Sequence, residues 1–318
     1  MRRDTRIGIT LGDPGGIGPE VVLKALARPA LPAASFALFG HAAVVEAAER
    51  ATGLRLDRTK FSLVEPSAGP SPTGAHRPTA DNGAASFAYF EEAVRAAREG
   101  RLDALATGPV SKAAWNLAGL SWRGHTEYLE HLYPGAIMTF WSDRLKLALL
   151  SHHLPLREAL GRITRDRLGR FLVSLAGDVQ AVRPGKTEFL VAGLNPHAGE
   201  GGALGREEIE EIGPAIEDAR AQGVRVRGPF PPDVAFRIAL DKPGAFAVGL
   251  YHDQGLIAFK IAAFETGVNV TLGLPFVRTS PDHGTAFDIA GENRADPESM
   301  IAAIALAGEL AKINTRKI

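Results

Sequence analysis

The 318-residue sequence contains no cysteine. Disulfide bonds, thiolate metal sites and cysteine nucleophiles are therefore excluded, and the composition fits the cytoplasm, where we expect the protein. The formal net charge is zero, which disfavours a nucleic-acid-binding surface because phosphate neutralisation needs clustered lysine and arginine. No apolar run approaches the roughly 20 residues of a membrane span, and the first residues lack the apolar segment of a signal peptide. We expect neither nucleic acid nor membrane as a partner.

The composition that remains is that of a globular protein, because 45% hydrophobic and 23% charged residues suit a sizeable core. Short apolar runs alternate with segments of helical spacing in the N-terminal third, which predicts a parallel sheet covered by helices. The predicted strands there are Ile7–Leu11, Ser35–Gly40, Phe61–Val64 and Leu102–Ala106. Farther along, Ala136–Ser142 and Leu145–Ser151 are separated by two residues, which predicts an antiparallel hairpin.

The segment Gly12–Glu20, GDPGGIGPE, follows the first predicted strand. Its glycines permit positive φ or close approach of the backbone to a ligand, and a tight turn without a ligand explains them equally well. The pattern is neither GxGxxG nor a P-loop, so it is no evidence for a nucleotide by itself.

Three histidines follow apolar strands: His153, His197 and His252. Each could be an ordinary hydrogen-bonded loop residue, but three in the same topological place also suit zinc or a similar divalent metal. Imidazoles are weaker evidence for magnesium, which prefers oxygen ligands. His152 is set aside, because neighbouring residues on a strand point to opposite faces.

The stretch from Tyr251 to Gly291 is the densest in groups that do chemistry. We expect Leu256–Phe259 to be a buried strand that ends in Lys260, and Asn269 to open another strand. Lys260, Arg278 and the earlier His125 could hold phosphate or carboxylate, although a single Lys or Arg is usually a solvated surface charge.

Eight motifs occur in the order seen in one known family: GDPGGIGPE, TGPVSK, GHTEYL, SHHLPL, GLNPHAGEGGALGREE, GPFPPD, YHDQGLIAFK and SPDHGTAFDIAG. On these motifs the chain resembles the 4-hydroxythreonine-4-phosphate dehydrogenase family, of the PdxA type, over nearly its whole length. The resemblance implies oxidation of 4-phosphooxy-L-threonine by NAD or NADP with one divalent metal ion (zinc, magnesium or cobalt). The β-keto acid formed would decarboxylate to 3-amino-2-oxopropyl phosphate, in pyridoxal 5'-phosphate biosynthesis.

The resemblance also assigns residues to the site. His153, His197 and His252 fall on metal ligands, and the substrate-binding positions are His125, Thr126, Lys260, Asn269 and Arg278. The last motif is similar to the loop that holds the adenosine part of the dinucleotide in isopropylmalate and isocitrate dehydrogenases. The implied cofactor residues are His283, Gly284, Thr285, Ala286, Asp288 and Asn293. Asp253 and Lys112 are the candidates for proton transfer, and Asp253 could instead orient a ligand histidine.

The implied fold is two α/β/α domains with the active site in a cleft between them, as in isocitrate and isopropylmalate dehydrogenases. We place one domain at residues 1–120 plus 280–318, with the cofactor loop. The other spans residues 121–279, with the metal and substrate residues and the dimer contacts. The family is a homodimer in which a partner residue completes each active site.

Two departures from the family pattern are Gly15 and Ser111, where many relatives carry alanine and histidine or asparagine. We expect the glycine to be harmless, whereas Ser111 bears on the substrate. The alternative within the family is a 4-phospho-D-threonate or D-erythronate dehydrogenase. A different class, a phosphorylated-metabolite binding protein or an acyltransferase-like enzyme, predicts no metal requirement and no NAD(H) signal.

Overall fold

The computed structural model describes residues 5–28, 31–66, 71–242 and 244–314. The chain divides into two compact units, which we call unit 1 (Met1–Ala136 and Val268–Ile318) and unit 2 (Ile137–Gly267). The chain therefore changes unit at residues 136–137 and 267–268, where the sequence placed the change near 120 and 280. With these limits His125, Asn269 and Arg278 belong to unit 1, and the three candidate metal histidines belong to unit 2.

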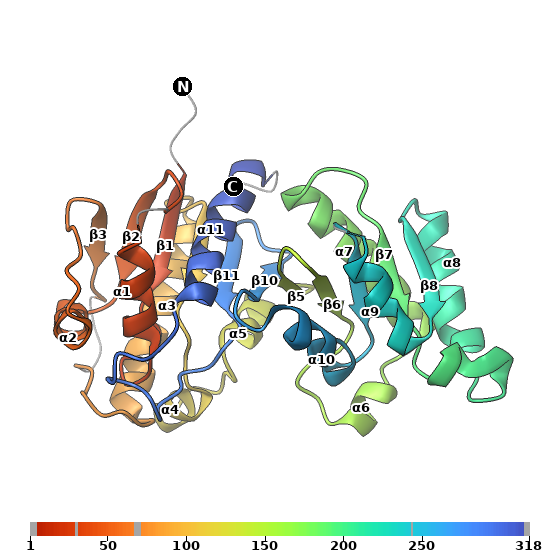
Figure 1. Cartoon of the computed structure of the whole chain (residues 1–318), viewed down its shortest axis with the longest axis horizontal. Coiled ribbons are helices and arrows are strands. Elements are labelled where there is room, and N and C mark those ends of the chain that lie inside the picture. Colours follow the sequence, from red (N-terminus) through yellow and green to blue (C-terminus); the bar gives the residue numbers. More distant parts are fainter. Residues whose placement is uncertain (1–4, 29–30, 67–70, 243, 315–318) are drawn as a thin grey trace. The chain divides into compact units, whose positions relative to one another are not determined.

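Unit 1 is built on strands in the order β3-β2-β1-β4-β11-β10 (Figure 1). The first five are parallel and β10 runs antiparallel to β11. The bounds are β1 Arg6–Thr10, β2 Ser35–Phe39, β3 Phe61–Val64, β4 Ala104–Thr107, β10 Val268–Leu272 and β11 Val277–Pro281. Ile7 and Ile9 on β1 have no exposed surface, because a parallel sheet is covered on both faces.

The helices of unit 1 are α1 Gly18–Leu26, α2 Ala42–Thr52, α3 Ala80–Arg98, α4 Lys112–Leu117, α5 His125–Leu132 and α11 Glu298–Ile313. Pro19 in the first turn of α1 suits a helix start, and the Thr79 side chain accepts a hydrogen bond from the Asn82 N–H at the start of α3. Helix α11 packs on the sheet, where the Thr279 hydroxyl donates to the Ala303 carbonyl at 2.8 Å.

Unit 2 has the strand order β5-β6-β9-β7-β8. The hairpin predicted from the sequence is confirmed as β5 Ile137–Trp141 paired antiparallel with β6 Lys146–Leu149. β9 Phe246–Gly249, β7 Phe189–Ala192 and β8 Val226–Phe230 continue parallel to β6. The helices are α6 Leu156–Leu160, α7 Arg165–Val182, α8 Gly213–Ala221, α9 Pro232–Leu240 and α10 His252–Ala263, with a π-helical turn at Glu208–Ile212 ahead of α8.

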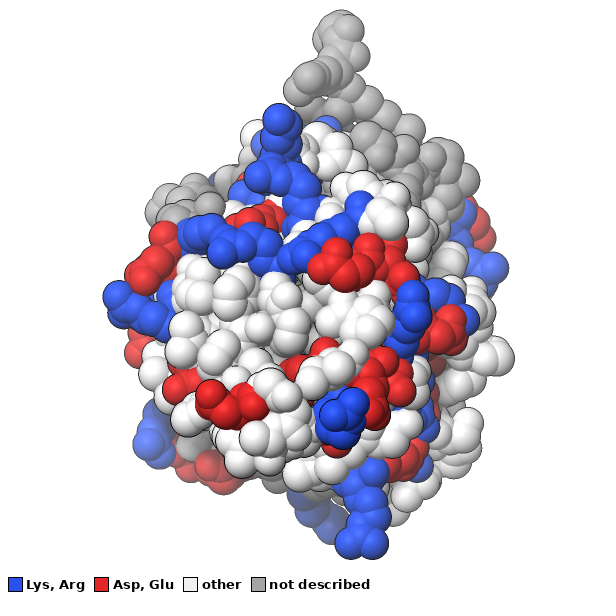
Figure 2. All heavy atoms as spheres, turned by 90° about the vertical axis from the view of Figure 1, so that its right-hand side faces the viewer, with Lys and Arg blue, Asp and Glu red and all other residues white. Residues whose placement is uncertain are grey.

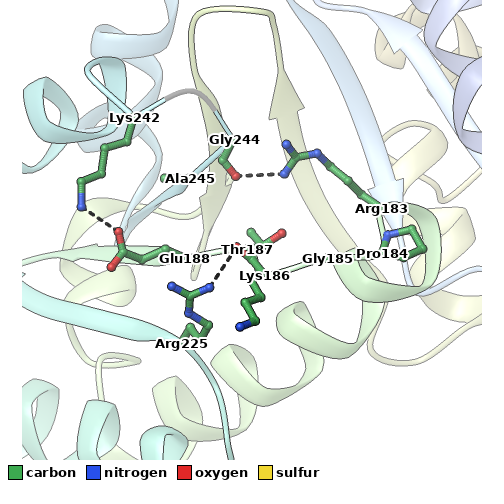
Figure 3. Close-up of a pocket in the computed structure, with 10 residues that line it drawn as sticks. All are labelled: Arg183, Pro184, Gly185, Lys186, Thr187, Glu188, Arg225, Lys242, Gly244 and Ala245. Atoms are coloured by element: carbon green, nitrogen blue, oxygen red, sulfur yellow. Dashed lines mark hydrogen bonds and ion pairs between the residues drawn. The ribbon is translucent and has the colours of Figure 1, made fainter.

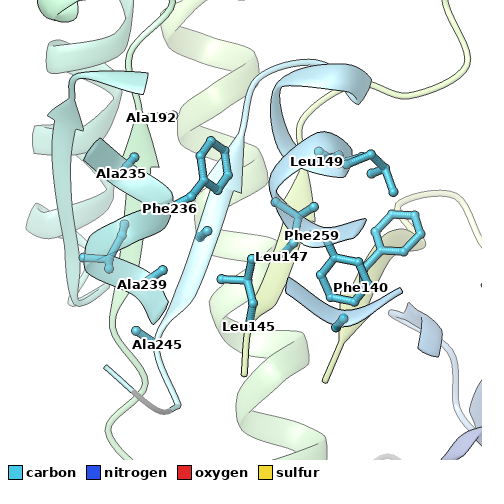
Figure 4. Packing of buried hydrophobic residues seen from close by; sticks show 14 of the residues in the cluster. Phe140, Leu145, Leu147, Leu149, Ala192, Ala235, Phe236, Ala239, Ala245 and Phe259 are labelled. Carbon is cyan, nitrogen blue, oxygen red and sulfur yellow. The ribbon is translucent and has the colours of Figure 1, made fainter. Parts of the chain in front are cut away.

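One hydrophobic cluster of unit 2 lies between this sheet and helices α9 and α10 (Figure 4). Phe140, Leu147 and Leu149 from the hairpin meet Phe236 of α9 and Phe259 of α10, all nearly without exposed surface. Mixed α/β architecture, with parallel strands and covering helices, is therefore the fold class that the sequence predicted.

The expected strand at Leu256–Phe259 is wrong, because these residues form the middle of α10. Leu256, Phe259 and Ala263 are buried at helical spacing, whereas Ile257 and Ile261 are exposed by 61% and 82%. An apolar run of four residues is compatible with a strand or with a helix. Here the helical period becomes visible only when the polar residues on either side of the run are included. No helix in the described ranges is long and apolar enough to cross a membrane.

Candidate active site

Arg278 on β11 is a buried cation surrounded by neutral groups. Its side chain is 2% exposed; Nη1 donates to Asn269 Oδ1 and Thr271 Oγ1, both at 3.2 Å, and Nη2 donates to Thr107 Oγ1 at 2.8 Å. The antiparallel register places Arg278 opposite Thr271. Burial lowers the pKa of the guanidinium to about 9, and Nε has no partner among the described residues. A buried cation that pairs with no described carboxylate is a candidate site for an anionic ligand.

His125 lies in the same unit, at the first turn of α5. Gly124 before it has φ 134°, a conformation that glycine adopts readily. The imidazole packs against the rings of Phe90 and Trp115, with centroids at 4.4 Å and 5.7 Å. Burial, and secondarily the charge of Arg278, lower the pKa of His125 well below its usual range. The ring is therefore neutral at pH 7, and its buried Nε2 is unpaired within the described part of the chain.

The glycine segment Gly12–Glu20 packs against the predicted cofactor loop. The Ile17 N–H donates to the Thr285 carbonyl at 2.9 Å, and a Cβ on Gly16 would lie 2.7 Å from that oxygen. Lys24 of α1 donates to the carbonyl of Asn293 at 3.1 Å. Close packing of two chain segments thus accounts for Gly16 without a ligand.

The cofactor loop itself has an unusual backbone. Ala286 and Asn293 have positive φ angles of 39° and 57°, which costs on the order of 1–3 kcal/mol at each non-glycine residue. His283 Nδ1 contacts the Gly284 carbonyl at 3.0 Å, while its buried Nε2 has no partner in the described ranges. Gly284 and Asp288 are exposed, and Thr285 is half-buried.

Asp13 was not singled out by the sequence reasoning, yet it is a buried carboxyl of the glycine segment. It has no exposed surface; Oδ1 accepts from the Gly15 N–H at 2.9 Å, and Oδ2 has no partner among the residues described. Burial raises the pKa of Asp13 to about 6, against the opposing effect of the Gly15 hydrogen bond. The segment Gly12–Gly16 contains no pattern of polar residues that would have indicated a functional carboxyl at Asp13.

In unit 2, His153 and His252 share a cavity of about 220 Å³. Their ring centroids are 5.5 Å apart. His252 Nδ1 lies 2.6 Å from Asp253 Oδ1, so that Nε2 is the nitrogen left for a ligand. His152 lines the same cavity, with its ring centroid 5.3 Å from that of His153. The expectation that these neighbours diverge is wrong: β6 ends at Leu149, and His153 has φ 51°, so strand alternation does not apply.

His197 stands apart from this pair, in the turn Pro196–Gly202 that follows β7. His197, Ala198 and Glu200 all have positive φ, which is rare for non-glycine residues. Its Nδ1 lies 2.9 Å from Glu200 Oε2, again leaving Nε2 for a ligand, and both side chains are exposed. The described residues hold no group of three or more His, Asp or Glu side chains placed to bind one metal ion.

Glu208 anchors the chain just before that turn. Its Oε1 accepts from the Leu194 and Asn195 N–H groups at 2.7 and 2.8 Å, and Oε2 accepts from the Asn195 side chain at 2.9 Å. Burial alone would raise the pKa of Glu208, but these hydrogen bonds lower it overall. The strained turn that carries His197 is thus tied to a fixed carboxylate.

The remaining candidates are simpler. Lys260 lies on α10 with its ammonium 5.3 Å from the Phe264 ring centroid, and Asp253 at the start of α10 is exposed. Lys112 is the exposed first residue of α4, whereas Ser111 is buried and its hydroxyl accepts from the Ala114 N–H at 3.1 Å. Thr126 follows His125 on α5 and is half-buried.

Comparison with known proteins finds close relatives. The profile of a family described as "Pyridoxal phosphate biosynthetic protein PdxA" matches residues 23–307. A 4-hydroxythreonine-4-phosphate dehydrogenase of Aquifex aeolicus is 39% identical, covering 96% of this chain and 98% of that protein. A D-threonate 4-phosphate dehydrogenase of Salmonella typhimurium is also 39% identical, over 96% and 98% of the two chains. The crystal structure of 4-hydroxythreonine-4-phosphate dehydrogenase from Klebsiella pneumoniae superposes with a TM-score of 0.83, at 35% identity over 97% and 98%.

Proposed function

Because the chain belongs to the pyridoxal phosphate biosynthetic protein PdxA family, we propose that it is an NAD(P)-dependent, decarboxylating dehydrogenase of 4-phosphooxy-L-threonine. Its product would be 3-amino-2-oxopropyl phosphate, for the synthesis of pyridoxal 5'-phosphate, and it would act in the cytoplasm. The observation that carries the proposal is Arg278. A fully buried guanidinium whose partners among the described residues are all neutral is suited to an anionic substrate group.

The substrate residues have separate tasks. Arg278 would bind a phosphate or carboxylate oxygen through Nε, its unpaired donor. Neutral His125 would add a hydrogen bond from Nε2 without adding charge. Asn269 and Thr271 hold the guanidinium in position, while Thr126 and Lys260 would contact the rest of the substrate.

The donors in unit 2 fit a divalent cation. His153 and His252 face one cavity, and both His252 and His197 have Nδ1 against a carboxylate, the arrangement that orients metal-binding imidazoles. Imidazole nitrogens favour zinc or cobalt over magnesium. In the other unit, the strained loop with the unpaired Nε2 of His283 is suited to hold the dinucleotide. Bound in these places, the dinucleotide would supply the acceptor for the hydride of the alcohol carbon, and the cation would supply the charge that lowers the pKa of the alcohol.

The chain must move two protons. The hydroxyl proton leaves to a base as the alcohol is oxidised, and Asp253 or Lys112 would accept it. The β-keto acid then breaks its bond to the carboxyl carbon and releases carbon dioxide. The electron pair that remains takes a proton, which completes the amino ketone phosphate.

A second copy of the chain would complete the site. Helix α10 exposes Ile257, Ile261 and Phe264 by 61%, 82% and 73%, at a spacing that places them on one face. A contiguous apolar stripe of this kind is typical of a subunit interface. Lys260 and His252 lie on the same helix, so a homodimer formed there would bring site residues of the two copies together.

The second candidate is a 4-phospho-D-threonate or D-erythronate dehydrogenase. It is supported by the Salmonella relative, which is as similar to this chain as the Aquifex protein. Ser111 is the position to examine, because its buried hydroxyl still has a proton to donate while it caps α4.

The test is the absorbance of reduced nicotinamide. Chelator-treated protein is mixed with 4-phosphooxy-L-threonine and NAD⁺ or NADP⁺, and zinc, cobalt or magnesium is then added. A signal that requires metal, and that is abolished by His197→Ala but kept by His131→Ala on α5, supports the dehydrogenase and the histidine site. Turnover of 4-phospho-D-threonate alone selects the second candidate, and silence on both substrates refutes both.

A further inference from the structure

A second polar cavity lies in unit 2, at the edge of the sheet opposite the histidines. It has a volume of about 340 Å³ and is lined by the segment 183–188 and by Arg225, Lys242, Gly244 and Ala245 (Figure 3). These segments come directly before β7, β8 and β9, which are parallel. His197 and His252 come after β7 and β9, so the cavity is separate from the candidate metal site.

Four cations line this cavity against one carboxylate. They are Arg183, Lys186, Arg225 and Lys242, and the carboxylate is Glu188. Figure 2, which faces the β8 end of unit 2, shows a band of Lys and Arg side chains, with some Asp and Glu side chains among them, above an area with few charges. In a protein whose formal net charge is zero, a local excess of three positive charges is a feature of this site and not of the whole surface.

The single carboxylate is already engaged. Glu188 forms an ion pair with Lys242, with 3.0 Å between Oε2 and Nζ. Its Oε1 lies 3.7 Å from Nη1 of Arg227. Burial alone would raise the pKa of Glu188, but Lys242, Arg227 and Arg225 lower it overall. Glu188 is therefore ionised at neutral pH and offsets one of the four lining charges, which leaves a net excess of three positive charges.

Of the other three lining cations, Arg183 and Arg225 are fixed by backbone carbonyls and Lys186 is not, and this arrangement favours an anion. Arg183 Nη1 donates to the Gly244 carbonyl at 2.9 Å, and Arg225 Nη1 donates to the Lys186 carbonyl at 3.3 Å, so neutral groups fix both guanidinium groups. Gly244 has φ 97°, and a Cβ there would lie 2.7 Å from Arg183 Nη2. The Lys186 ammonium has no hydrogen-bond or ion-pair partner within the described chain.

From this cavity and its unbalanced cations we propose a second ligand site, which binds a small phosphorylated molecule carrying two or more negative charges. Arginine forks and lysine point charges together suit phosphate oxygens, and the cavity is within the usual size range of small-ligand sites. The site goes beyond the proposed dehydrogenase activity and does not depend on it.

The test is calorimetric titration with inorganic diphosphate at low salt. We compare the wild type with the double variant Lys186→Ala/Arg225→Ala, with Arg278→Met, and with the control Arg170→Ala. Arg170 is an exposed arginine of α7 that pairs with Asp166 outside the cavity. We expect the double variant to bind diphosphate at this cavity about tenfold more weakly or worse, whereas a binding event that depends on Arg278 should persist in it. Arg170→Ala and Arg278→Met should retain this binding, which should also weaken as salt is added.

Two results would overturn the proposal. The first is diphosphate binding that survives in the double variant but is lost in Arg278→Met, which assigns the anion to the candidate active site. The second is a requirement for Lys186 and Arg225 only with a single-stranded oligonucleotide or with phosphatidylglycerol vesicles, and not with diphosphate. That outcome would make the surface a macromolecular contact. Melting temperatures of all variants, measured without ligand, control for folding.

Discussion

Replacing Arg278 by methionine is expected to abolish turnover while changing the stability of the protein very little. A buried arginine in a conventional ion pair behaves differently, because removing one partner of such a pair costs about 3–5 kcal/mol. Arg278 pairs with no described carboxylate and makes three hydrogen bonds to neutral groups. A residue that binds substrate rather than supports the fold should show this separation of stability from activity.

The magnitude follows from two opposing contributions. Burial lowers the pKa of Arg278 to about 9, far below its ordinary value, which corresponds to about 5 kcal/mol against the charged form. Three hydrogen bonds to a charged group contribute about 1.5 kcal/mol each, or about 4.5 kcal/mol in favour. The two nearly cancel, so we expect Arg278→Met to change the free energy of unfolding by less than about 2 kcal/mol.

The cost of burying the charged Arg278 side chain applies at the pH of the assay. A base whose folded pKa is lowered stays protonated at pH 7 in both states, and the destabilisation is relieved only as the pH rises through about 9. Urea unfolding at pH 7 therefore measures the full balance, and kcat/KM for 4-phosphooxy-L-threonine measures the function. Inorganic phosphate should raise the melting temperature of the wild type more than that of Arg278→Met. A loss of more than about 3 kcal/mol in the variant, with activity falling only in proportion to the folded fraction, would refute this reasoning.

Four further predictions concern other parts of the chain. Asp13 has a folded pKa of about 6 against 3.8 unfolded, so it destabilises the fold increasingly as the pH rises from about 4 through 6. Asp13→Asn should remove that slope and gain up to about 3 kcal/mol at pH 8 in urea unfolding, and an unchanged slope would contradict it. Glu208→Gln should lose about 2 kcal/mol or more and weaken metal binding, measured by chelator competition, whereas the exposed Glu210→Gln should do neither. Although many relatives carry alanine at this position, Gly15→Ala should destabilise this chain by about 1–3 kcal/mol, since the added Cβ would lie 2.4 Å from the Ala75 carbonyl; a variant as stable as the wild type would show that the loop relaxes freely. Ile261→Glu should shift the sedimentation profile from dimer to monomer, and a persistent dimer would exclude α10 as the interface.

The sequence determined the periodic part of the fold. Strands such as Phe61–Val64 and the hairpin of β5 and β6 follow from local apolar runs and from the turn between them, which are properties of adjacent residues. The same locality explains the errors. Leu256–Phe259 is too short a run to show its period, and no strand was predicted at Val226–Phe230, because its glycine and proline hide the pattern.

The sequence also marked most of the candidate site residues, through motifs long enough to reveal the family. It could not show their environments. The family resemblance marks Arg278 as a substrate residue, but its burial and its neutral partners arise from the pairing of β11 with β4 and β10, strands up to 174 positions apart. Nothing in the sequence indicated that Asp13 is buried with a raised pKa, because its burial depends on the tertiary structure.

Tertiary packing likewise determines that His153 lies beside His252 and that His197 lies apart from them. The sequence determined that each histidine follows a strand, because strand ends are encoded locally. Which rings share a cavity depends on the order β6-β9-β7 and on a strained turn at His197, neither of which local sequence encodes. The sequence thus determines which residues can bind or react. Their burial, their charge balance and the distances between them depend on packing between distant segments.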